Sequence, residues 1–315
     1  MTTRGDVSAR ELVLVRVFDA PRTLVFKAWT EPKRLAQWWG PKGFTCPVCE
    51  MDARPGGKWR IVMRGPDGGE YPHGGEILEI DPPAKIVMTN ALEGDAAPFG
   101  PSTWTVNFDE VDGKTTLTTR VVCETVEDRD TMDRMQWRVG YGMSLDKLAV
   151  ELAIDRREPA KTLDVTAPPN LGIVVVTRWF DAPRELVWKV TTEAEHFQNW
   201  WGPRRYKNHI LEMDVRVGGR YRIEQRGGNG EVHPFRGEYL EIEAPHRLVM
   251  TQGYADFPPL TLTIELTEKD GGTLLTGTMD MGSVEVRDTV LKSGMESGMR
   301  ESYERMDELM ATLAK

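Results

Sequence analysis

The chain repeats itself once, and the size of this repeat constrains the fold more than any other feature of the sequence. Four short segments recur, and the members of every matched pair lie 162 residues apart. The pairs are FDAPR at 18–22 and 180–184, WWGP at 38–41 and 200–203, GEILEI at 75–80 with GEYLEI at 237–242, and IVMTN at 86–90 with LVMTQ at 248–252. One repeat of this size predicts two similar domains of about 150 residues each, not a solenoid of short units.

A stretch of different composition separates the two copies. Residues 155–170 read DRREPAKTLDVTAPPN, in which charges and three prolines break any periodic pattern. Such a composition is typical of a linker. We therefore predict a first domain at 1–157, a linker at 158–170 and a second domain at 171–315.

Each copy carries a mixed pattern of strands and helices. In the first copy, residues 11–18 alternate like a strand, and residues 21–39 predict two short helices. Turn residues then separate six predicted strands, at roughly 44–53, 58–64, 70–80, 85–91, 103–110 and 115–123. A closing helix is predicted at about 130–154 from one apolar stripe, formed by Met132, Met135, Val139, Gly142, Leu145, Ala149 and Leu152. This order predicts an α+β fold in which a curved antiparallel sheet surrounds a long C-terminal helix.

These segments resemble a known family, the activator of heat-shock-protein-90 ATPase homologue-like domain of the START/Bet v 1-like (SRPBCC) superfamily. The resemblance is carried by FDAPR, WWGP, the GG-x-W/Y-R turn, the GEILEI and IVMT segments and the helix GMSLDKL, and it covers both copies. It implies the helix-grip fold, in two tandem copies, with a cavity between sheet and helix. The superfamily includes lipid carriers, polyketide cyclases, hormone receptors and co-chaperones, so the fold alone does not name a function.

Composition narrows the class of partner and the compartment. The 315 residues carry a net charge of −9, which argues against binding nucleic acid, because phosphates demand a basic surface. No apolar run reaches the roughly 18–20 residues of a membrane span. With three cysteines and no apolar leader, we expect a cytoplasmic protein without a disulfide framework.

The Cys46-Pro-Val-Cys49 pair is the first candidate for chemistry. Zinc usually needs four ligands, and no second pair lies at a suitable spacing. The second copy has Asn208 and Leu211 at the equivalent positions, so the fold does not require the thiols. We predict a structural role, with a redox-sensitive pair as the alternative, and no metal site.

The histidines do not indicate a catalytic centre. His73 and His233 lie in related segments but not at the same register, since Pro72 pairs with Pro234, and a general base needs an orienting partner. We interpret them as hydrogen-bonded residues at strand edges. No nucleophile or phosphate-binding motif stands out, so no catalytic residue and no cofactor is predicted.

The candidate ligand site is the concave side of each sheet. Glu76 and Glu238 are predicted either as polar anchors in a cavity or as surface charges paired with an arginine such as Arg60 or Arg222. The other candidates are apolar side chains and helix glycines that allow close approach, although they would equally suit a filled core. They are Trp39, Trp59, Met63, Met88, Trp104, Phe108, Gly142, Trp201, Tyr221, Met250, Gly294 and Gly298.

The function predicted from these observations is the binding of a small hydrophobic molecule by each domain, without catalysis. One alternative is a co-chaperone-like module that acts in the stress response by activating a chaperone ATPase. Another is an enzyme of the cyclase or hydrolase type, which needs a polar residue deep in the cavity. We also expect the two domains to pack as a pseudo-two-fold pair, because tandem duplication of a self-associating fold gives that arrangement.

Overall fold

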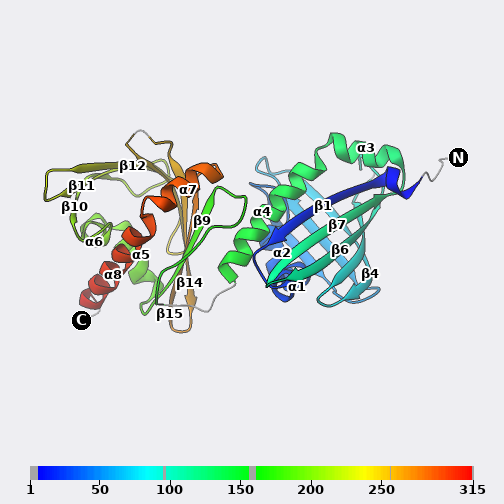
Figure 1. Cartoon of the computed structure of the whole chain (residues 1–315), viewed down its shortest axis with the longest axis horizontal. Coiled ribbons are helices and arrows are strands. Elements are labelled where there is room, and N and C mark those ends of the chain that lie inside the picture. Colours follow the sequence, from blue (N-terminus) through cyan, green and yellow to red (C-terminus); the bar gives the residue numbers. More distant parts are fainter. Residues whose placement is uncertain (1–5, 95–96, 156–160, 256, 314–315) are drawn as a thin grey trace. The chain divides into compact units, whose positions relative to one another are not determined.

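The computed structural model describes residues 6–94, 97–155, 161–255 and 257–313. The chain divides into two compact units, Met1–Arg156 and Arg157–Lys315, and each is considered by itself. In both units a strand is followed by two short helices, six strands and two closing helices (Figure 1).

The first unit begins with a 3₁₀ turn at Val7–Arg10. Its strands are β1 (Glu11–Phe18), β2 (Thr45–Met51), β3 (Lys58–Arg64), β4 (Glu70–Asp81), β5 (Lys85–Leu92), β6 (Ser102–Val111) and β7 (Lys114–Cys123). Its helices are α1 (Arg22–Thr30), α2 (Pro32–Trp38), α3 (Val126–Arg134) and α4 (Trp137–Asp155). All seven predicted strands are present within one or two residues of these bounds, which confirms the α+β reading.

The second unit repeats this plan. Its strands are β9 (Ile173–Phe180), β10 (Tyr206–Met213), β11 (Arg220–Gly227), β12 (Val232–Glu243), β13 (Arg247–Tyr254), β14 (Leu260–Lys269) and β15 (Gly272–Asp280), and its helices are α5 (Arg184–Thr192), α6 (Ala194–Trp200), α7 (Val284–Lys292) and α8 (Met295–Leu313). One further strand, β8 (Asp164–Thr166), lies inside the range predicted as a linker and pairs with β9. The segment before β9 is therefore part of the second sheet.

Each unit has one antiparallel sheet, and its buried face packs against helices. The strand order is β1-β7-β6-β5-β4-β3-β2 in the first unit and β10-β11-β12-β13-β14-β15-β9-β8 in the second. Helices α1, α2 and α4 contact one another, and α1 also contacts β6 and β7. This is the helix-grip arrangement, in which the concave side of the sheet holds the core (Figure 1).

The closing helix is not continuous, contrary to the prediction of a single helix over 130–154. It breaks between α3 and α4, where Gln136 has φ = 56°, and Gly294 makes the equivalent break between α7 and α8 with φ = 86°. The predicted stripe is partly confirmed: Met132, Leu145 and Leu152 are buried, whereas Met135 and Val139 are exposed. The buried face of α4 also includes Tyr141, Ser144, Leu148 and Ala153, which the stripe did not contain.

A tryptophan hydrogen bond fixes the corner between the two short helices of each unit. The buried Trp38 indole donates to the Ala28 carbonyl at 2.9 Å, and Trp200 donates to the Val190 carbonyl at 2.8 Å. Because the indole N–H is satisfied, the ring can be buried without leaving an unpaired donor. This bond explains why the first Trp of each WWGP segment belongs to the framework.

A second shared contact sets the bend of each sheet. The Trp59 indole donates to the Thr89 carbonyl at 3.0 Å, and the Tyr221 hydroxyl donates to the Thr251 carbonyl at 2.9 Å. The strand between each pair carries a glycine, Gly75 or Gly237. A Cβ added at either position would lie about 2 Å from the threonine carbonyl oxygen. Only a residue without a side chain fits there, which accounts for the GE that begins each matched GEILEI and GEYLEI segment.

These glycines give a prediction with a matched control. Gly75→Ala should lower the free energy of unfolding of the first unit by about 1–3 kcal/mol, because the added methyl group collides with backbone. Gly142→Ala on α4 should instead raise it by about 1 kcal/mol, since a Cβ there meets no atom within 4 Å and alanine favours the helix. Calorimetry of both variants checks this, and equal effects of the two substitutions would contradict it.

Candidate functional site

The second Trp of the first WWGP segment points into the concave side of the first sheet. Trp38 ends α2, and Trp39 already has an extended backbone conformation. Trp39 is 5% exposed, and its ring lies 5.3 Å from that of Trp38. Lys147 of α4 donates to the carbonyls of Gly40 and Phe44 at 3.3 Å, which ties the following turn to the closing helix.

Trp39 forms a polar trio with the buried His73 of β4 and the half-buried Asn90 of β5. The Trp39 indole donates to His73 Nε2 at 3.0 Å, and His73 Nδ1 lies 3.2 Å from Asn90 Oδ1. An indole N–H can only donate, so Nε2 accepts and the imidazole proton is on Nδ1, from which it is donated to Asn90. Burial lowers the pKa of His73 to about 4, which keeps this ring neutral at physiological pH.

Five further contacts extend the trio into a continuous group of rings. Trp39 stacks on Trp104 at 6.0 Å, Trp59 meets the His73 ring edge to face at 5.4 Å, and Trp104 contacts Tyr141 at 5.4 Å. At the start of α4, Trp137 stacks on Tyr141 at 5.1 Å and meets Trp104 at 5.6 Å. We call this group the aromatic cluster; it comprises Trp39, Trp59, His73, Trp104, Trp137 and Tyr141.

The N–H and O–H groups of most rings in the aromatic cluster are hydrogen-bonded to polar partners. Trp104 donates its indole N–H to Ser102 Oγ at 3.1 Å, and the Tyr141 hydroxyl lies 2.7 Å from Thr119 Oγ1. Burial raises the pKa of the Tyr141 hydroxyl, so it stays protonated. The concave side of the first unit is therefore aromatic, uncharged at these positions, and locally hydrogen-bonded.

The second unit keeps the framework but not this polar chemistry. Phe235 replaces His73, as each faces an isoleucine of the neighbouring strand, and its ring packs on Trp201 at 4.7 Å. At the positions of Trp104, Thr119, Trp137 and Tyr141 the second unit has Leu262, Gly277, Met295 and Met299. The two copies thus differ at these positions of the aromatic cluster.

The remaining candidate residues fall into three environments. Met88, Phe108, Tyr221 and Met250 are buried in the cores, and Met63 and Trp201 are half-buried beside them. Glu76 lies at the surface and pairs with Lys58 at 2.5 Å, while the half-buried Glu238 donates its backbone N–H to Thr251 Oγ1. A Cβ added at Gly298 would lie 3.4 Å from Pro203 Cγ. Gly142 lies beside the buried face of α4, and Gly294 is in the break before α8.

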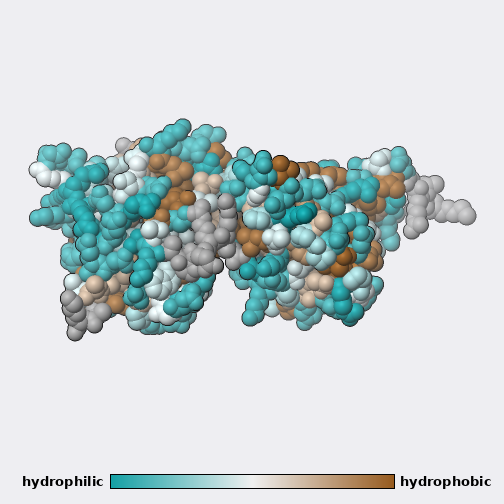
Figure 2. Space-filling view, turned by 60° about the horizontal axis from the view of Figure 1, so that its bottom comes forward, coloured by the Kyte–Doolittle hydropathy of each residue, from teal (hydrophilic) through white to brown (hydrophobic). Residues whose placement is uncertain are grey.

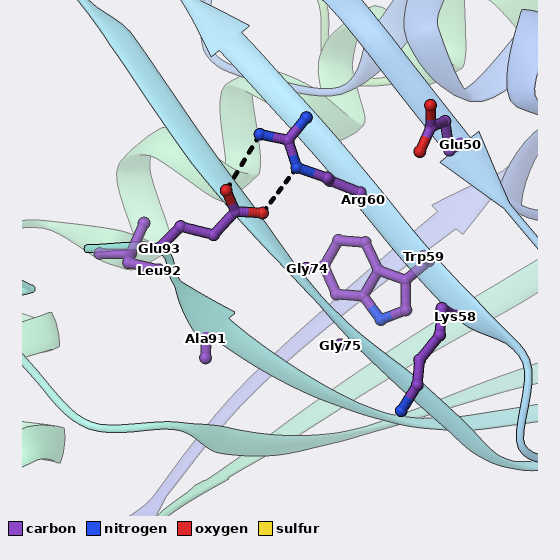
Figure 3. A pocket seen from close by; sticks show the side chains of 9 residues that line it. All are labelled: Glu50, Lys58, Trp59, Arg60, Gly74, Gly75, Ala91, Leu92 and Glu93. Carbon is purple, nitrogen blue, oxygen red and sulfur yellow. Dashed lines mark hydrogen bonds and ion pairs between the residues drawn. The ribbon is translucent and has the colours of Figure 1, made fainter.

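A surface hollow of about 350 Å³ lies over the bend of the first sheet (Figure 3). Arg60 and Glu93 form one side of it and are joined by two hydrogen bonds of 2.7 and 3.0 Å. Its floor is open because Gly74 and Gly75 have no side chains, and Trp59 also lines it. Arg60 and Lys58 alternate with Trp59 along β3, so their side chains lie on the opposite face of the strand from the Trp59 ring. An exposed ion pair such as that of Arg60 and Glu93 contributes little free energy. We assign no ligand to this hollow.

The cysteine pair supports the backbone next to Trp39. Cys46 Sγ donates to the Trp39 carbonyl at 3.1 Å, and Asn208 Nδ2 makes the same contact with the Trp201 carbonyl at 2.6 Å. Burial raises the pKa of Cys46, raises that of Cys49 to about 12, and raises that of Cys123 to about 11. The thiols are therefore held in the unreactive, protonated form.

One group of possible metal ligands lies in the second unit. Glu193, Glu195 and His196 bring one ligand atom each to within 4.8 Å of one another at the start of α6. Both carboxylates are exposed, and His196 lies 3.5 and 3.6 Å from them. This spacing is that of a surface ion-pair group at the start of a seven-residue helix.

Sequence reasoning missed three functional candidates. His73 was interpreted as a strand-edge residue, but β4 lies inside the sheet and His73 is only 5% exposed. Trp137 and Tyr141 were not singled out, because the predicted helix stripe passed beside them. The available signal was the contrast between the two copies. The residues of the second copy that correspond to His73, Trp137 and Tyr141 are Phe235, Met295 and Met299, all of which are apolar.

The fold and the site define a tandem pair of helix-grip domains, and comparison with known proteins gives the family. The chain matches the family described as activator of Hsp90 ATPase homolog 1-like protein twice, over residues 19–153 and 181–311. The chain therefore belongs to this family, as two tandem copies. No curated protein matches the chain at a significant level.

Several solved structures are similar to about half of the chain. A protein from Rhodobacter sphaeroides is 26% identical, with a TM-score of 0.46, and the match covers 48% of this chain and 99% of that one. A protein from Mycobacterium smegmatis is also 26% identical, with a TM-score of 0.44 and coverages of 47% and 96%. A protein from Chromobacterium violaceum is 28% identical, with a TM-score of 0.42 and coverages of 45% and 96%.

Apolar side chains reach the surface as scattered patches among polar ones (Figure 2). Within the described ranges, no helix is both long and apolar enough to cross a bilayer.

The buried histidine makes stability depend on pH. The pKa of His73 is about 4 in the folded state and about 6.5 when unfolded, so the unfolded chain binds the extra proton between these values. The first unit should lose about 2.5 kcal/mol of stability through His73 as the pH falls from 6.5 to 4, and less than about 0.5 kcal/mol through it above pH 6.5. Denaturation of the intact protein and of His73→Phe at pH 7 and pH 4 measures this difference, and equal losses in both would contradict it.

The raised thiol pKa values predict slow chemical modification. At pH 8 the folded protein should react with a disulfide reagent at least about 100-fold more slowly than the chain in denaturant, where thiol pKa values are about 8.5. Timed absorbance of the released thiolate checks this. A fast phase of two equivalents in the folded protein would instead support the redox-sensitive reading of Cys46 and Cys49.

Proposed function

We propose that the first unit binds a small, largely apolar molecule on the concave side of its sheet, beside the trio of Trp39, His73 and Asn90. The family's fold supports a binding or interaction module in general. The observation that carries the finer proposal is the polar trio in the first unit, where the second unit has the contact between Phe235 and Trp201. The role is that of a carrier, a sensor or a sequestering protein.

The contrast between the two copies supports this assignment because it separates framework from site. A buried histidine is costly unless both ring nitrogens are hydrogen-bonded. Trp39 and Asn90 meet this requirement for His73, whereas the second unit folds around phenylalanine at the same place, so the fold requires neither the histidine nor its two hydrogen bonds. The framework contacts of Trp38 and Trp59, by contrast, recur in the second unit as those of Trp200 and Tyr221.

The same geometry favours binding over catalysis. Both His73 nitrogens are already engaged by Trp39 and Asn90, and the pKa of His73 is about 4. A general base works best with a pKa near the working pH. His73 is therefore suited to hold Trp39 and Asn90 in place beside a bound molecule, and not to abstract a proton.

Exposed apolar residues favour a second candidate, a protein-interaction module. Met135, Val139 and Met143 follow one another at four-residue spacing and are 58%, 51% and 40% exposed. The second unit has Ser293, Ser297 and Glu301 at these positions. The family's description suggests a chaperone ATPase as the partner, and a steady-state ATPase assay with and without the protein tests this candidate.

Retention of a ligand tests the leading proposal. Native mass spectrometry of the protein isolated from its own host should show a bound small molecule, and that molecule should raise the melting temperature of the protein further with each tenfold increase in its concentration above Kd. His73→Phe should weaken binding at least about tenfold, because the hydrogen bonds that position the Trp39 indole and the Asn90 amide are lost.

The control is His233→Phe in the second unit, where His233 bonds to Tyr254 at 2.7 Å. It should leave the affinity unchanged. The proposal fails if no molecule is retained and a screen of lipids, polyketides and aromatic compounds gives no thermal shift. It also fails if both histidine variants weaken binding equally.

A further inference from the structure

Trp137 differs from the other tryptophans of the aromatic cluster in how it is held. The indole N–H groups of Trp39, Trp59 and Trp104 donate to His73, Thr89 and Ser102. These three side chains are at most 5% exposed. Trp137 is half-buried, and within the described ranges its indole has ring contacts but no hydrogen bond. Moving the Trp137 ring therefore breaks no indole hydrogen bond and exposes less buried surface than moving Trp39, Trp59 or Trp104.

The backbone next to Trp137 is a break between two helices. Helix α3 ends at Arg134, α4 begins at Trp137, and Gln136 between them has φ = 56°. A non-glycine residue in this region costs about 1–3 kcal/mol and persists only where surrounding contacts hold it. The equivalent break in the second unit uses Gly294, which adopts the same region without that cost.

The Trp137 ring fills a slot shaped for a flat aromatic group. Its plane lies 21° from that of Tyr141 at a centroid distance of 5.1 Å, and it meets Trp104 nearly edge-on at 85° and 5.6 Å. One wall of the slot is thus a ring face and another is a ring edge, the two arrangements that aromatic pairs prefer. Trp104 in turn stacks on Trp39, so the slot continues to the His73 trio.

We propose that Trp137 is a displaceable plug and that an uncharged, planar aromatic molecule takes its place between Tyr141 and Trp104. This inference rests on the proposed function and names the class of ligand for the same site. The walls are aromatic rings, and the hydrogen-bonding groups around them, Ser102, Thr119 and Asn90, are neutral. A charged ligand would lose its hydration there without gaining a partner of opposite charge.

The second unit offers the matched control. Met295 and Met299 stand at the positions of Trp137 and Tyr141, and Leu262 stands at that of Trp104. Flexible, unbranched methionine side chains adapt to any neighbour and do not form a flat slot. We therefore assign the aromatic site to the first unit alone.

Indole is the probe, because it is uncharged and has the shape of the plug. With 5-fluorotryptophan in the protein, saturation with indole should move the fluorine resonance of Trp137, identified through Trp137→Phe, towards its position in the unfolded chain. In calorimetric titration, Trp137→Ala should bind indole about tenfold more tightly than the intact protein, because no plug has to leave. Met295→Ala should bind as the intact protein does, and cyclohexanol, which is not planar, should bind more weakly than indole.

The outcomes separate this inference from the proposed function. If the retained molecule binds in a His73-dependent way while the Trp137 resonance stays in place, only the plug is disproved. Binding of indole by Trp137→Ala with none by the intact protein would show an artificial cavity and would also contradict the plug. If Trp137→Ala does not fold, Trp137→Leu takes its place, and an affinity equal to or weaker than that of the intact protein counts against the proposal.

Discussion

The hydrogen bond from the Trp38 indole to the Ala28 carbonyl fixes the corner on which the concave side of the first unit depends. It holds α2 against α1, so the chain leaves the helix at Trp39 with that ring directed into the core. Trp39 then meets His73 on β4, and through Trp104 the contacts reach α4. Without the corner, the sheet and the closing helix would lose the ring that joins them. The same bond, from Trp200 to Val190, supports the second unit without the polar trio.

Most of the fold could be predicted from local sequence signals. Alternating strands and turn residues placed all seven strands of the first unit, because a period of two and a glycine or proline turn are properties of short segments. The break at Gln136 could not be predicted, since nothing in its own chemistry marks a left-handed residue. The predicted stripe of the closing helix was only partly right, for a related reason. Val139 and Met143 are apolar but exposed, so the helix has two apolar faces and periodicity alone cannot choose between them.

The candidate site was predictable by residue type but not by contact. Tryptophans at 39, 59 and 104 were expected on the concave side, where they do lie together in the core. Glu76 was ambiguous because a register shift between Ile77 and Glu79 interrupts the simple alternation of β4. The hydrogen bond between Trp39 and His73 joins residues from a helix end and a distant strand, which no local pattern specifies. Only the difference between the copies, His73 against Phe235, pointed to it.

The unequal copies have a consequence for stoichiometry. A duplicated fold is ordinarily read as two equivalent sites, yet the polar trio and the flat slot occur in one unit of this chain, and Phe235, Leu262 and Met299 take those places in the other. On the proposed function, one equivalent of ligand saturates a protein of two similar halves. A titration that ends at one per chain is then the signature of a duplication whose copies have divided their tasks, with binding in one half and an apolar core in the other.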